Sequence, residues 1–294
     1  MFIDLLLISI VKTLQQIIRI LPEHAQCSIG MSFGRLAFLI LKGRKKVAIS
    51  NIKRAFKNIN DCEAADIAKK NFEKLGINFI EMLMIPFVPK SEYSSRFTME
   101  NQHHIDDALK QNKGVIVLIF HYTNWEIMGV ASTSLSNEIV VLARPIKKHK
   151  YINDFLNNIR NATGLRIIPN ADSAKDVIRH LKANKIIGIL ADQREKRSRG
   201  VFVELFGEKV PTTKGIAAIG MKTGAPVIPM YFVREGFLRY RVVWNEPIEM
   251  ERKGPIEELI YRNTRKINAF LETIILKHPD EWFWVHRRWG GKRK

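Results

Sequence analysis

An apolar run that ends in a histidine constrains the fold of this chain more than any other stretch. Residues 115–120 are Val-Ile-Val-Leu-Ile-Phe, and His121 follows them directly. A short uninterrupted run of this kind is typical of a strand buried on both faces, as in parallel sheets. Residues 125–135 favour a helix, with Thr123 or Asn124 as its N-cap. We therefore expect His121 at the carboxyl end of a central strand, where open α/β sheets bind their ligands.

Glu126 is the second candidate catalytic residue, because it follows His121 by five positions. On a continuous helix or strand these two side chains would point apart, but a strand–turn–helix can bring them together. Glu126 would then accept a hydrogen bond from one imidazole nitrogen and leave the other nitrogen as a general base. Two other interpretations stay open. Thr123 and Glu126 form a capping-box pattern, and a histidine that ends a strand is often a hydrogen-bonded core residue.

The rest of the chain alternates between strand and helix patterns. We expect helices at 100–111, 125–135, 151–163, 171–183, 213–223 and 256–276, and strands at 115–120, 138–143, 165–168, 186–191, 201–205, 227–232 and 238–244. This alternation predicts an α/β fold with a mostly parallel central sheet flanked by helices. Pro86 and Pro89 end an amphipathic helix that begins at Asp61. They mark a predicted boundary between a helical N-terminal part, residues 1–90, and an α/β body, residues 91–294.

The formal net charge of +19 at pH 7 limits the partners of this chain. It favours nucleic acid, an anionic membrane surface, an acidic protein or a phosphorylated substrate. Cys27 and Cys62 stand far apart, which indicates neither a disulfide framework nor a zinc site and fits a reducing cytosol. The sequence has no Gly-rich phosphate loop and no metal-ligand cluster, so we expect no metal ion and no other cofactor.

The first 21 residues are apolar but are interrupted by Asp4, Lys12 and Arg19. The longest uncharged run is shorter than the roughly 20 residues that a spanning helix needs. The segment also lacks the pattern of a cleaved signal peptide. On a helical wheel its polar residues gather on one side, which predicts an interfacial amphipathic helix that anchors the N-terminal part to a membrane. A helix packed on the protein's own core is the alternative.

A second basic segment lies between Lys42 and Lys57, which contains seven cations and no acidic residue. Beside an amphipathic helix it is typical of an anchor for anionic lipid headgroups, and the alternative is a solvated helix face. The C-terminal stretch from Trp282 to Trp289 combines aromatic residues with cations. This combination is found at membrane interfaces, and it is also compatible with a helix packed over the core.

Cations also follow the ends of two predicted strands. Arg144 ends the strand at 138–143, and Asp192 and Gln193 end the strand at 186–191. Strand ends that face one rim and carry cations make a natural anion site. Considered one by one, Asp192 is compatible with a turn residue, and the cations are compatible with solvated loops. The candidates for binding a donor or a phosphate are Lys147, Lys148, Lys150, Arg194, Arg197 and Arg199.

Taken together, these motifs resemble the late acyltransferases of lipid A biosynthesis, within the wider lysophospholipid acyltransferase superfamily. The resemblance covers nearly the whole chain. It rests on His121-Tyr-Thr-Asn-Trp-Glu126 (the family's His-x4-Asp/Glu box), Ala143-Arg-Pro145, Arg160-Asn-Ala-Thr-Gly164, Asp192-Gln193, Gly200-Val-Phe-Val203, Phe206-Gly207, Gly224-Ala-Pro-Val-Ile-Pro229 and Trp284-Val-His-Arg-Arg-Trp289. The chain departs from the family pattern at Phe120, where a small residue is usual, at Thr123, where glycine is common, and at Glu204-Leu205, which replaces a Pro-Phe pair.

The resemblance implies an O-acyltransferase in which His121, oriented by Glu126, takes a proton from an acceptor hydroxyl. The hydroxyl then attacks an acyl thioester. The implied donor is acyl carrier protein, and the implied acceptor is an anionic lipid, a lipid A precursor. The implied place is the cytoplasmic face of the bacterial inner membrane. The candidates for binding the substrate or the oxyanion are Asn124, Arg144, Arg160, Asp192 and Gln193.

Two alternatives belong to other classes of acceptor or of protein. One is a sister acyltransferase that acts on a lysophospholipid, glycolipid or aminolipid and uses acyl-CoA. The other is a non-catalytic nucleic-acid-binding protein, which the charge alone permits. The basic residues scatter over loops and both termini, and no helix-turn-helix, zinc-finger or RNA-binding aromatic pattern appears. We therefore expect no nucleic-acid partner.

Overall fold

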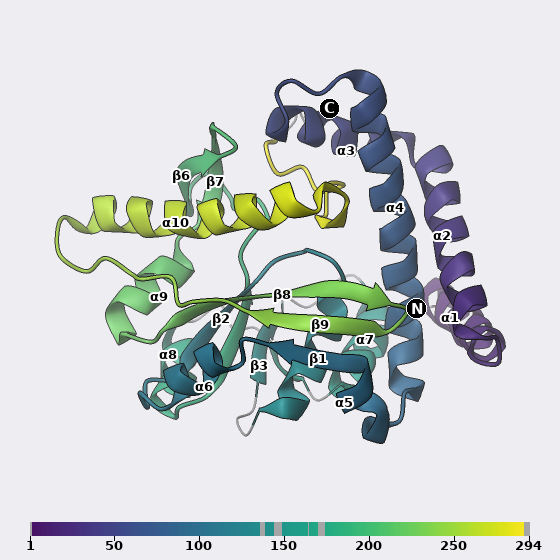
Figure 1. Cartoon of the computed structure of the whole chain (residues 1–294), viewed down its shortest axis with the longest axis horizontal. Helices are drawn as coiled ribbons and strands as arrows, with labels where there is room; N and C mark the ends of the chain where they lie inside the picture. The colour runs from purple at the N-terminus through teal and green to yellow at the C-terminus, as the bar shows by residue number, and fades with distance from the viewer. Residues whose placement is uncertain (1, 136–138, 144–148, 164, 170–173, 291–294) are drawn as a thin grey trace.

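A seven-stranded, mostly parallel sheet forms the centre of the molecule (Figure 1). The computed structural model describes residues 2–135, 139–143, 149–163, 165–169 and 174–290. The order of the strands is β1-β9-β8-β2-β5-β3-β4, and of the neighbouring pairs only β8 and β9 are antiparallel. The strands are β1 (Phe97–Glu100), β2 (Val115–Ile119), β3 (Ile139–Ala143), β4 (Arg166–Pro169), β5 (Ile186–Leu190), β8 (Val227–Gly236) and β9 (Arg239–Trp244). The predicted α/β class and the mostly parallel sheet are thus confirmed.

The central strand β2 is buried on both faces, as its apolar run predicts. Val117 and Ile119 belong to the core on one face of the sheet. Ile116, Leu118 and Phe120 belong to the core on the other face. This alternation follows from the two-residue period of a strand, and it needs layers of helices on both sides.

Helices from different parts of the chain cover the two faces of the sheet. The core around Val117 takes apolar residues from α4, α6, η3 and α7, and the core around Ile116 takes them from α8, α9 and α10. The boundaries are α6 (His103–Leu109), the 3₁₀ helix η3 (Trp125–Ser134), α7 (Lys150–Ala162), α8 (Ala174–Lys182), α9 (Gly215–Thr223), α10 (Ile256–Lys277) and the short 3₁₀ helix η4 (Pro279–Glu281).

Two features of the body differ from the prediction. The strand β1 lies just before a helix that was expected to begin at residue 100, so α6 is shorter than predicted. The strand predicted at 201–205 is present but lies outside the central sheet. It is β6 (Gly200–Leu205), which pairs only with β7 (Glu208–Thr213) in an antiparallel hairpin. Phe206 and Gly207 form its two-residue turn with φ of 52° and 76°, the left-handed conformation that suits a tight hairpin.

The N-terminal part is made of four helices, which are α1 (Phe2–Arg19), α2 (Glu23–Ile40), α3 (Lys42–Ala55) and α4 (Asp61–Met84). Two short 3₁₀ turns, η1 (Ile85–Phe87) and η2 (Lys90–Glu92), and α5 (Tyr93–Arg96) lead from them to β1. The second half of α4 is part of the sheet's core, since Ile80 and Leu83 are fully buried there. The division of the chain at residue 90 stays a prediction.

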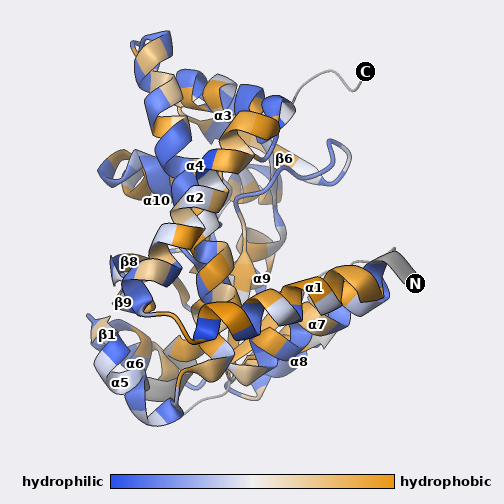
Figure 2. Cartoon of the chain, turned by 90° about the vertical axis from the view of Figure 1, so that its right-hand side faces the viewer, coloured by the Kyte–Doolittle hydropathy of each residue, from blue (hydrophilic) through white to orange (hydrophobic). Residues whose placement is uncertain are grey.

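The helix α1, largely hydrophobic in composition (Figure 2), both packs on the protein and exposes apolar residues. Two of its polar residues face the protein: Asp4 lies 3.0 Å from Nδ1 of His149, and Nε2 of Gln15 donates to the carbonyl of Leu83. Leu6 and Ile10 instead face outward and are about half exposed. Other apolar residues of α1 pack on the protein's own core, where Ile18 is 1% exposed and Val11 and Leu14 lie against it, so both interpretations of α1 stay open. None of the helices in the described ranges is long and apolar enough to cross a membrane.

The C-terminal aromatic segment packs over the core. Trp282 and Trp284 are 2% and 0% exposed, and Asn71 and Asn51 donate to their carbonyl groups. The segment therefore packs against the protein itself, but residues 282–290 do not form the helix that was predicted for this packing.

Candidate active site

The carboxyl ends of β2 and β5 bring His121 and Asp192 together. The two strands pair in parallel with Ile119 opposite Leu190, and the backbone N–H of Ala191 donates to the carbonyl of Ile119. The residues that follow are therefore neighbours. Nδ1 of His121 lies 2.7 Å from Oδ1 of Asp192, and the backbone N–H of His121 donates to Oδ2 at 2.9 Å.

Asp192 is an ionised carboxylate at the base of this site. It is 3% exposed, and its Oδ2 also accepts a 2.7 Å hydrogen bond from the indole N–H of Trp282. Burial alone would raise the pKa of Asp192. The charge of His121 and the hydrogen bonds from His121 and Trp282 outweigh it, so the pKa lies below its ordinary value. An ionised Asp192 accepts the proton of Nδ1, which leaves the lone pair of His121 on Nε2.

The second imidazole nitrogen of His121, Nε2, contacts a polar side chain, and two aromatic rings lie beside the imidazole. The side-chain amide of Gln193 lies 2.9 Å from Nε2 and donates to it. The rings of Trp125 and Phe283 lie 4.9 and 5.9 Å from the imidazole, measured between ring centroids. Gln193 is an exposed residue. A hydroxyl that binds at Nε2 of His121 must displace the side-chain amide of Gln193.

Glu126 has a different partner from the one predicted. Its carboxylate accepts two hydrogen bonds from Arg160, at 2.7 Å from Nε and 2.9 Å from Nη2. Its Oε1 also accepts a 3.1 Å hydrogen bond from the indole N–H of Trp125. Within the described ranges the structure shows no hydrogen bond between Glu126 and His121. The reason is geometric: η3 carries Glu126 toward α7, and Asp192 already occupies Nδ1 of His121.

The capping-box interpretation of Glu126 does not hold either. The hydroxyl of Thr123 donates to the carbonyl of Phe232 at 2.8 Å, and the carboxylate of Glu126 is engaged by Arg160. Thr123 has φ of 52°, in the left-handed region, where glycine is more usual than a β-branched residue. The loop between β2 and η3 therefore needs support from its surroundings.

The helix α4 supplies that support. Asn78 donates to the carbonyl of Thr123 at 2.6 Å, and the amide of Asn124 donates to Oε2 of Glu81 at 2.9 Å. Asn124, a predicted substrate-binding residue, is 1% exposed and thus belongs to the support of the loop. The amide of Asn124 fixes the loop on the fully buried carboxylate of Glu81.

Glu81 is the most highly connected acid in the described part of the chain. Its Oε1 accepts hydrogen bonds from Arg234 at 2.5 Å and from the backbone N–H of Leu238 at 2.8 Å, and its Oε2 accepts one from the hydroxyl of Tyr240 at 2.5 Å. Burial raises the pKa of Tyr240 well above its ordinary value, so this hydroxyl stays a donor. Sequence analysis missed this network. Its signal was an acid inside the apolar end of α4, the stretch Phe79-Ile-Glu-Met-Leu-Met84.

The predicted cations lie at several places. Arg194, Arg197 and Arg199 are exposed on the loop that begins at Asp192 and Gln193. Lys150 is exposed at the start of α7, the helix that carries Arg160. Arg144, Lys147 and Lys148 lie outside the described residues.

Two residues of the C-terminal segment lie beside the site and were not predicted individually. Nε2 of His286 accepts a hydrogen bond from the backbone N–H of Arg194 at 3.1 Å. Burial lowers the pKa of His286 to about 4, so it is neutral at neutral pH. Arg288 is fully buried and donates to the carbonyl of Pro211 and the hydroxyl of Thr212. Both residues were visible in the sequence only as members of an aromatic, basic motif.

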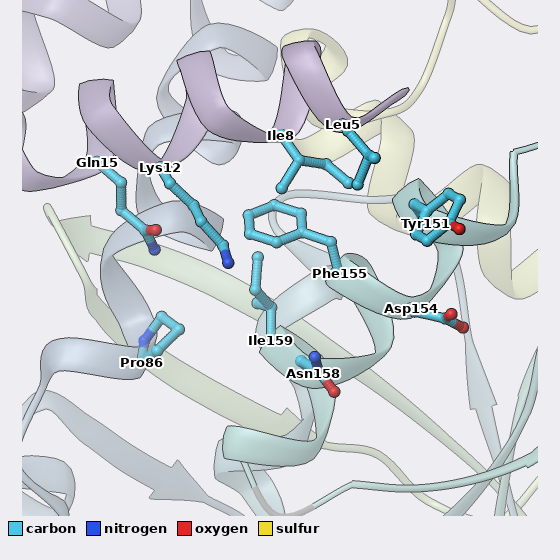
Figure 3. Close-up of a pocket in the computed structure, with 10 residues that line it drawn as sticks. All are labelled: Leu5, Ile8, Lys12, Gln15, Pro86, Tyr151, Asp154, Phe155, Asn158 and Ile159. Atoms are coloured by element: carbon cyan, nitrogen blue, oxygen red, sulfur yellow. The ribbon is translucent and has the colours of Figure 1, made fainter. Parts of the chain in front are cut away.

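A pocket of about 380 Å³ lies between α1 and α7 (Figure 3). Its volume is within the range of about 300–1,000 Å³ typical of small-molecule sites. Ile8 and Phe155 point into it from opposite sides, and Lys12 lies at its edge. Its wall includes Ile159, so α7 carries both a side of this pocket and, in the next position, the Arg160 that holds Glu126.

An imidazole with one nitrogen fixed on a buried carboxylate is the arrangement that enzymes use for a general base. Together with its place at the carboxyl edge of a parallel sheet, this pair fits an α/β enzyme that moves a proton through a histidine. Residues 3–290 match the family model described as bacterial lipid A biosynthesis acyltransferase. The chain therefore belongs to this family of acyltransferases, as the sequence resemblance predicts.

Individual relatives agree with the family model. The chain is 25% identical over 271 residues to the lipid A biosynthesis palmitoleoyltransferase of Escherichia coli, a match that spans 91% of this chain and 86% of the relative. It is 23% identical over 270 residues to the lipid A biosynthesis lauroyltransferase of the same organism, with the same coverage. A phosphatidylinositol mannoside acyltransferase of Mycobacterium tuberculosis is 24% identical over 137 residues, which is 45% of this chain and 43% of the relative.

Proposed function

We propose that this acyltransferase moves a fatty acyl chain from the thioester of acyl carrier protein to a hydroxyl of a lipid A precursor, with His121 as the general base. The observation that carries this proposal is the 2.7 Å contact between Nδ1 of His121 and the buried carboxylate of Asp192. That contact fixes the tautomer in which Nε2 accepts a proton.

In the proposed reaction His121 first accepts a proton from the acceptor and later returns a proton to the leaving group. The acceptor hydroxyl replaces the Gln193 amide at Nε2 of His121, gives up its proton and attacks the thioester carbonyl. Asp192 stabilises the imidazolium that forms. The tetrahedral intermediate then collapses, the C–S bond breaks, and the leaving thiolate takes the proton back from His121. The products are an ester and a free thiol, and no acyl-enzyme is required.

Glu126 has a positioning role in this proposal. The two hydrogen bonds that its carboxylate accepts hold the guanidinium of Arg160 in one orientation near the segment from His121 to Glu126. The side chain of Arg160 keeps 25% of its surface exposed. Burial would lower the pKa of Arg160, but the hydrogen bonds and charge of Glu126 outweigh it, so the pKa is raised and the cation is secured. A fixed cation of this kind can stabilise the oxyanion of the intermediate or a phosphate of the acceptor.

The donor is argued from charge. The exposed cations Arg194, Arg197 and Arg199 lie on the loop that carries Gln193, and the amide of Gln193 contacts Nε2 of His121. Acyl carrier protein presents an acidic helical surface, whereas coenzyme A presents a few phosphates. A run of cations therefore suits the carrier protein better.

The place of action is proposed from α1. Its outward apolar residues and its lack of spanning length suit a helix that lies in the interface of a bilayer. We place the protein on the cytoplasmic face of the bacterial inner membrane, where a lipid A precursor and a cytosolic carrier protein meet.

One other acceptor class has support. The match to a phosphatidylinositol mannoside acyltransferase over 45% of the chain favours a glycolipid acceptor, with acyl carrier protein or acyl-CoA as donor, as the second candidate function.

The test is a transfer assay with purified protein, a lipid A precursor and either acyl carrier protein or acyl-CoA as the thioester donor, read by mass spectrometry of the lipid. We expect acylated precursor with the carrier protein and none with the His121→Ala variant, which should fold normally. Acylation of a mannolipid in place of the lipid A precursor would favour the second candidate. A lack of transfer to either lipid would contradict both.

A further inference from the structure

The helix α2 exposes an apolar row along its C-terminal half. Phe33, Leu36 and Ile40 are separated by three and four residues, so they share one face of the helix. Each is exposed, and Leu36 and Ile40 reach 50% and 63%. Leu39 and Leu41 extend this exposed surface to the end of the helix. The row formed by Phe33, Leu36, Leu39, Ile40 and Leu41 is called the α2 row below.

The opposite face of α2 is locked against α4. A Cβ at Gly30 would lie 2.7 Å from Cα of Ile77, so the two backbones are in close contact there. Arg35 and Glu73 form an ion pair at 2.8 Å across the same interface. The helix is therefore held with its apolar row turned outward, and a rotation that buries the row would break this packing.

Cationic residues follow the α2 row directly in the sequence. The helix α3 begins at Lys42, directly after Leu41, and Lys42, Arg44 and Lys46 are all exposed. No acidic residue occurs between 42 and 57. An exposed apolar row that ends in a group of cations is complementary to a bilayer with anionic headgroups, because the apolar residues enter the interface while the cations remain at the phosphates.

The outward face of α1 lies on the same side of the molecule as α2. The two helices are the outermost elements toward the viewer in Figure 2, and Leu21 and Pro22 join them. Ile20, at this joint, is 80% exposed. The outward residues of α1 and the α2 row thus form two apolar arms on one side of the molecule, separated by the N-terminal half of α2, whose exposed residues are His24, Ser28 and Ser32.

We propose that the α2 row, together with the first cations of α3, is a second docking element for an anionic phospholipid bilayer, independent of α1. This inference builds on the membrane-associated function proposed above. Two apolar arms at an angle fix the orientation of the protein on the bilayer, whereas a single helix would leave it free to tilt about its axis. A chain that lacks residues 1–21 therefore still binds such vesicles, and high salt alone does not release it.

The experiment compares flotation of variants with vesicles of phosphatidylcholine and phosphatidylglycerol, at low and high salt. The row variant is Phe33→Ser/Leu36→Ser/Ile40→Ser. Its matched control is Ile256→Ser/Leu276→Ser, which removes two similarly exposed apolar residues from α10. The row variant should bind the vesicles about tenfold or more weakly at both salt concentrations, and the control should bind like the unaltered chain. Lys42→Glu/Lys46→Glu should weaken binding mainly at low salt.

Three results would overturn the proposal. They are unchanged binding of the row variant, equal losses in the row variant and the α10 control, and a change from dimer to monomer in the row variant without loss of vesicle binding. The last would assign the row to a second copy of the chain, and light scattering of the same samples detects it. Thermal unfolding shows that each variant is folded. The vesicles contain no acyl donor or acceptor, so acyl transfer, measured separately in detergent, distinguishes failure of this inference from failure of the proposed function.

Discussion

At the scale of single residues, His121 has two candidate carboxylates, and their surroundings give them different roles. Asp192 is buried, accepts three hydrogen bonds from His121 and Trp282, and has a lowered pKa. Glu126 is partly exposed and forms a two-pronged ion pair with Arg160. A carboxylate already engaged by a guanidinium is well placed to hold that cation, while a buried carboxylate on Nδ1 is well placed to orient a base.

A double-mutant cycle tests whether Glu126 acts through Arg160. We expect Glu126→Gln and Arg160→Ala each to lower kcat by about tenfold to a hundredfold, because both remove the fixed cation. The double variant should lose little more than either single variant, since the two residues act as a unit. Losses that multiply in the double variant would show that Glu126 and Arg160 act separately. The measurement is the kcat of acyl transfer at saturating donor.

The acid side of the stability profile should depend on His286. Burial lowers the pKa of His286 in the folded state to about 4, below its ordinary value of 6.5. The unfolded chain therefore binds this proton first, so the contribution of His286 to stability is complete above pH 6.5 and is lost as the pH falls toward 4. Urea denaturation at a series of pH values should show this decline. In His286→Gln the decline between pH 6.5 and 4 should be smaller, and an unchanged decline would contradict the assignment.

At the scale of elements, sequence patterns located the strands that build the site but not their order. The apolar run of β2 placed His121 at a strand end, and the run at 186–191 placed Asp192 at another. Whether those two ends touch depends on β5 lying next to β2, although β3 and β4 come between them in the sequence. Local periodicity carries no information about this order, so the nearer Glu126 was predicted as the partner of His121.

The support that α4 gives to the loop between β2 and η3 could not be predicted from local sequence patterns for the same reason. Glu81 and Arg234 are 153 residues apart, and their contact depends on α4 crossing the sheet beside β8 and β9. An acid in an apolar helix end can be recognised from the sequence, but its partner cannot. Which residues of α1 pack on the core was likewise undecided, because a helical wheel defines two faces without saying which one meets the protein.

The buried ion pair of Glu81 and Arg234 should be costly to break. Glu81→Gln leaves a cation uncompensated at the end of α4, and we expect a loss of about 3–5 kcal/mol in the free energy of unfolding. Glu258→Gln breaks the exposed pair with Arg262 on α10 and should cost at most about 1 kcal/mol. Urea denaturation of both variants compares the two costs. Equal small losses would mean that the buried network does not hold the loop.

At the scale of the whole molecule, exposed cations and exposed apolar residues lie on different elements. The exposed cations Arg194, Arg197 and Arg199 lie on the loop that follows Asp192, and exposed apolar residues lie on α1 and α2. Under the function proposed above, the cations meet the acidic donor and the apolar residues meet the membrane that holds the acceptor. The net charge of +19 favours anionic partners, but it does not tell which residues would meet them.

Charge reversal on the loop after Asp192 tests the choice of donor. Arg197→Glu/Arg199→Glu should lower kcat/KM for acyl carrier protein more at low salt than at high salt, because steering acts over a Debye length of about 8–10 Å. Turnover at saturation should change little. Lys222→Glu/Lys277→Glu, on α9 and α10, is the matched control. If acyl-CoA is used as efficiently and suffers equally, the carrier protein is not the preferred donor.

The most direct test of the central claim, that Asp192 orients His121 as the base, is the kcat of the Asp192→Asn variant. This substitution keeps the shape of the side chain but removes the charge that holds the proton on Nδ1. We predict a fall in kcat of about 10²–10⁴ with little change in KM, and a normally folded protein by circular dichroism. Trp282→Phe, which removes the indole hydrogen bond to Asp192 together with part of a ring packed on Trp284 and Trp289, should cost much less kcat. An Asp192→Asn variant with near-normal kcat, beside a Glu126→Gln variant that is nearly inactive, would contradict the account and return the orienting role to Glu126.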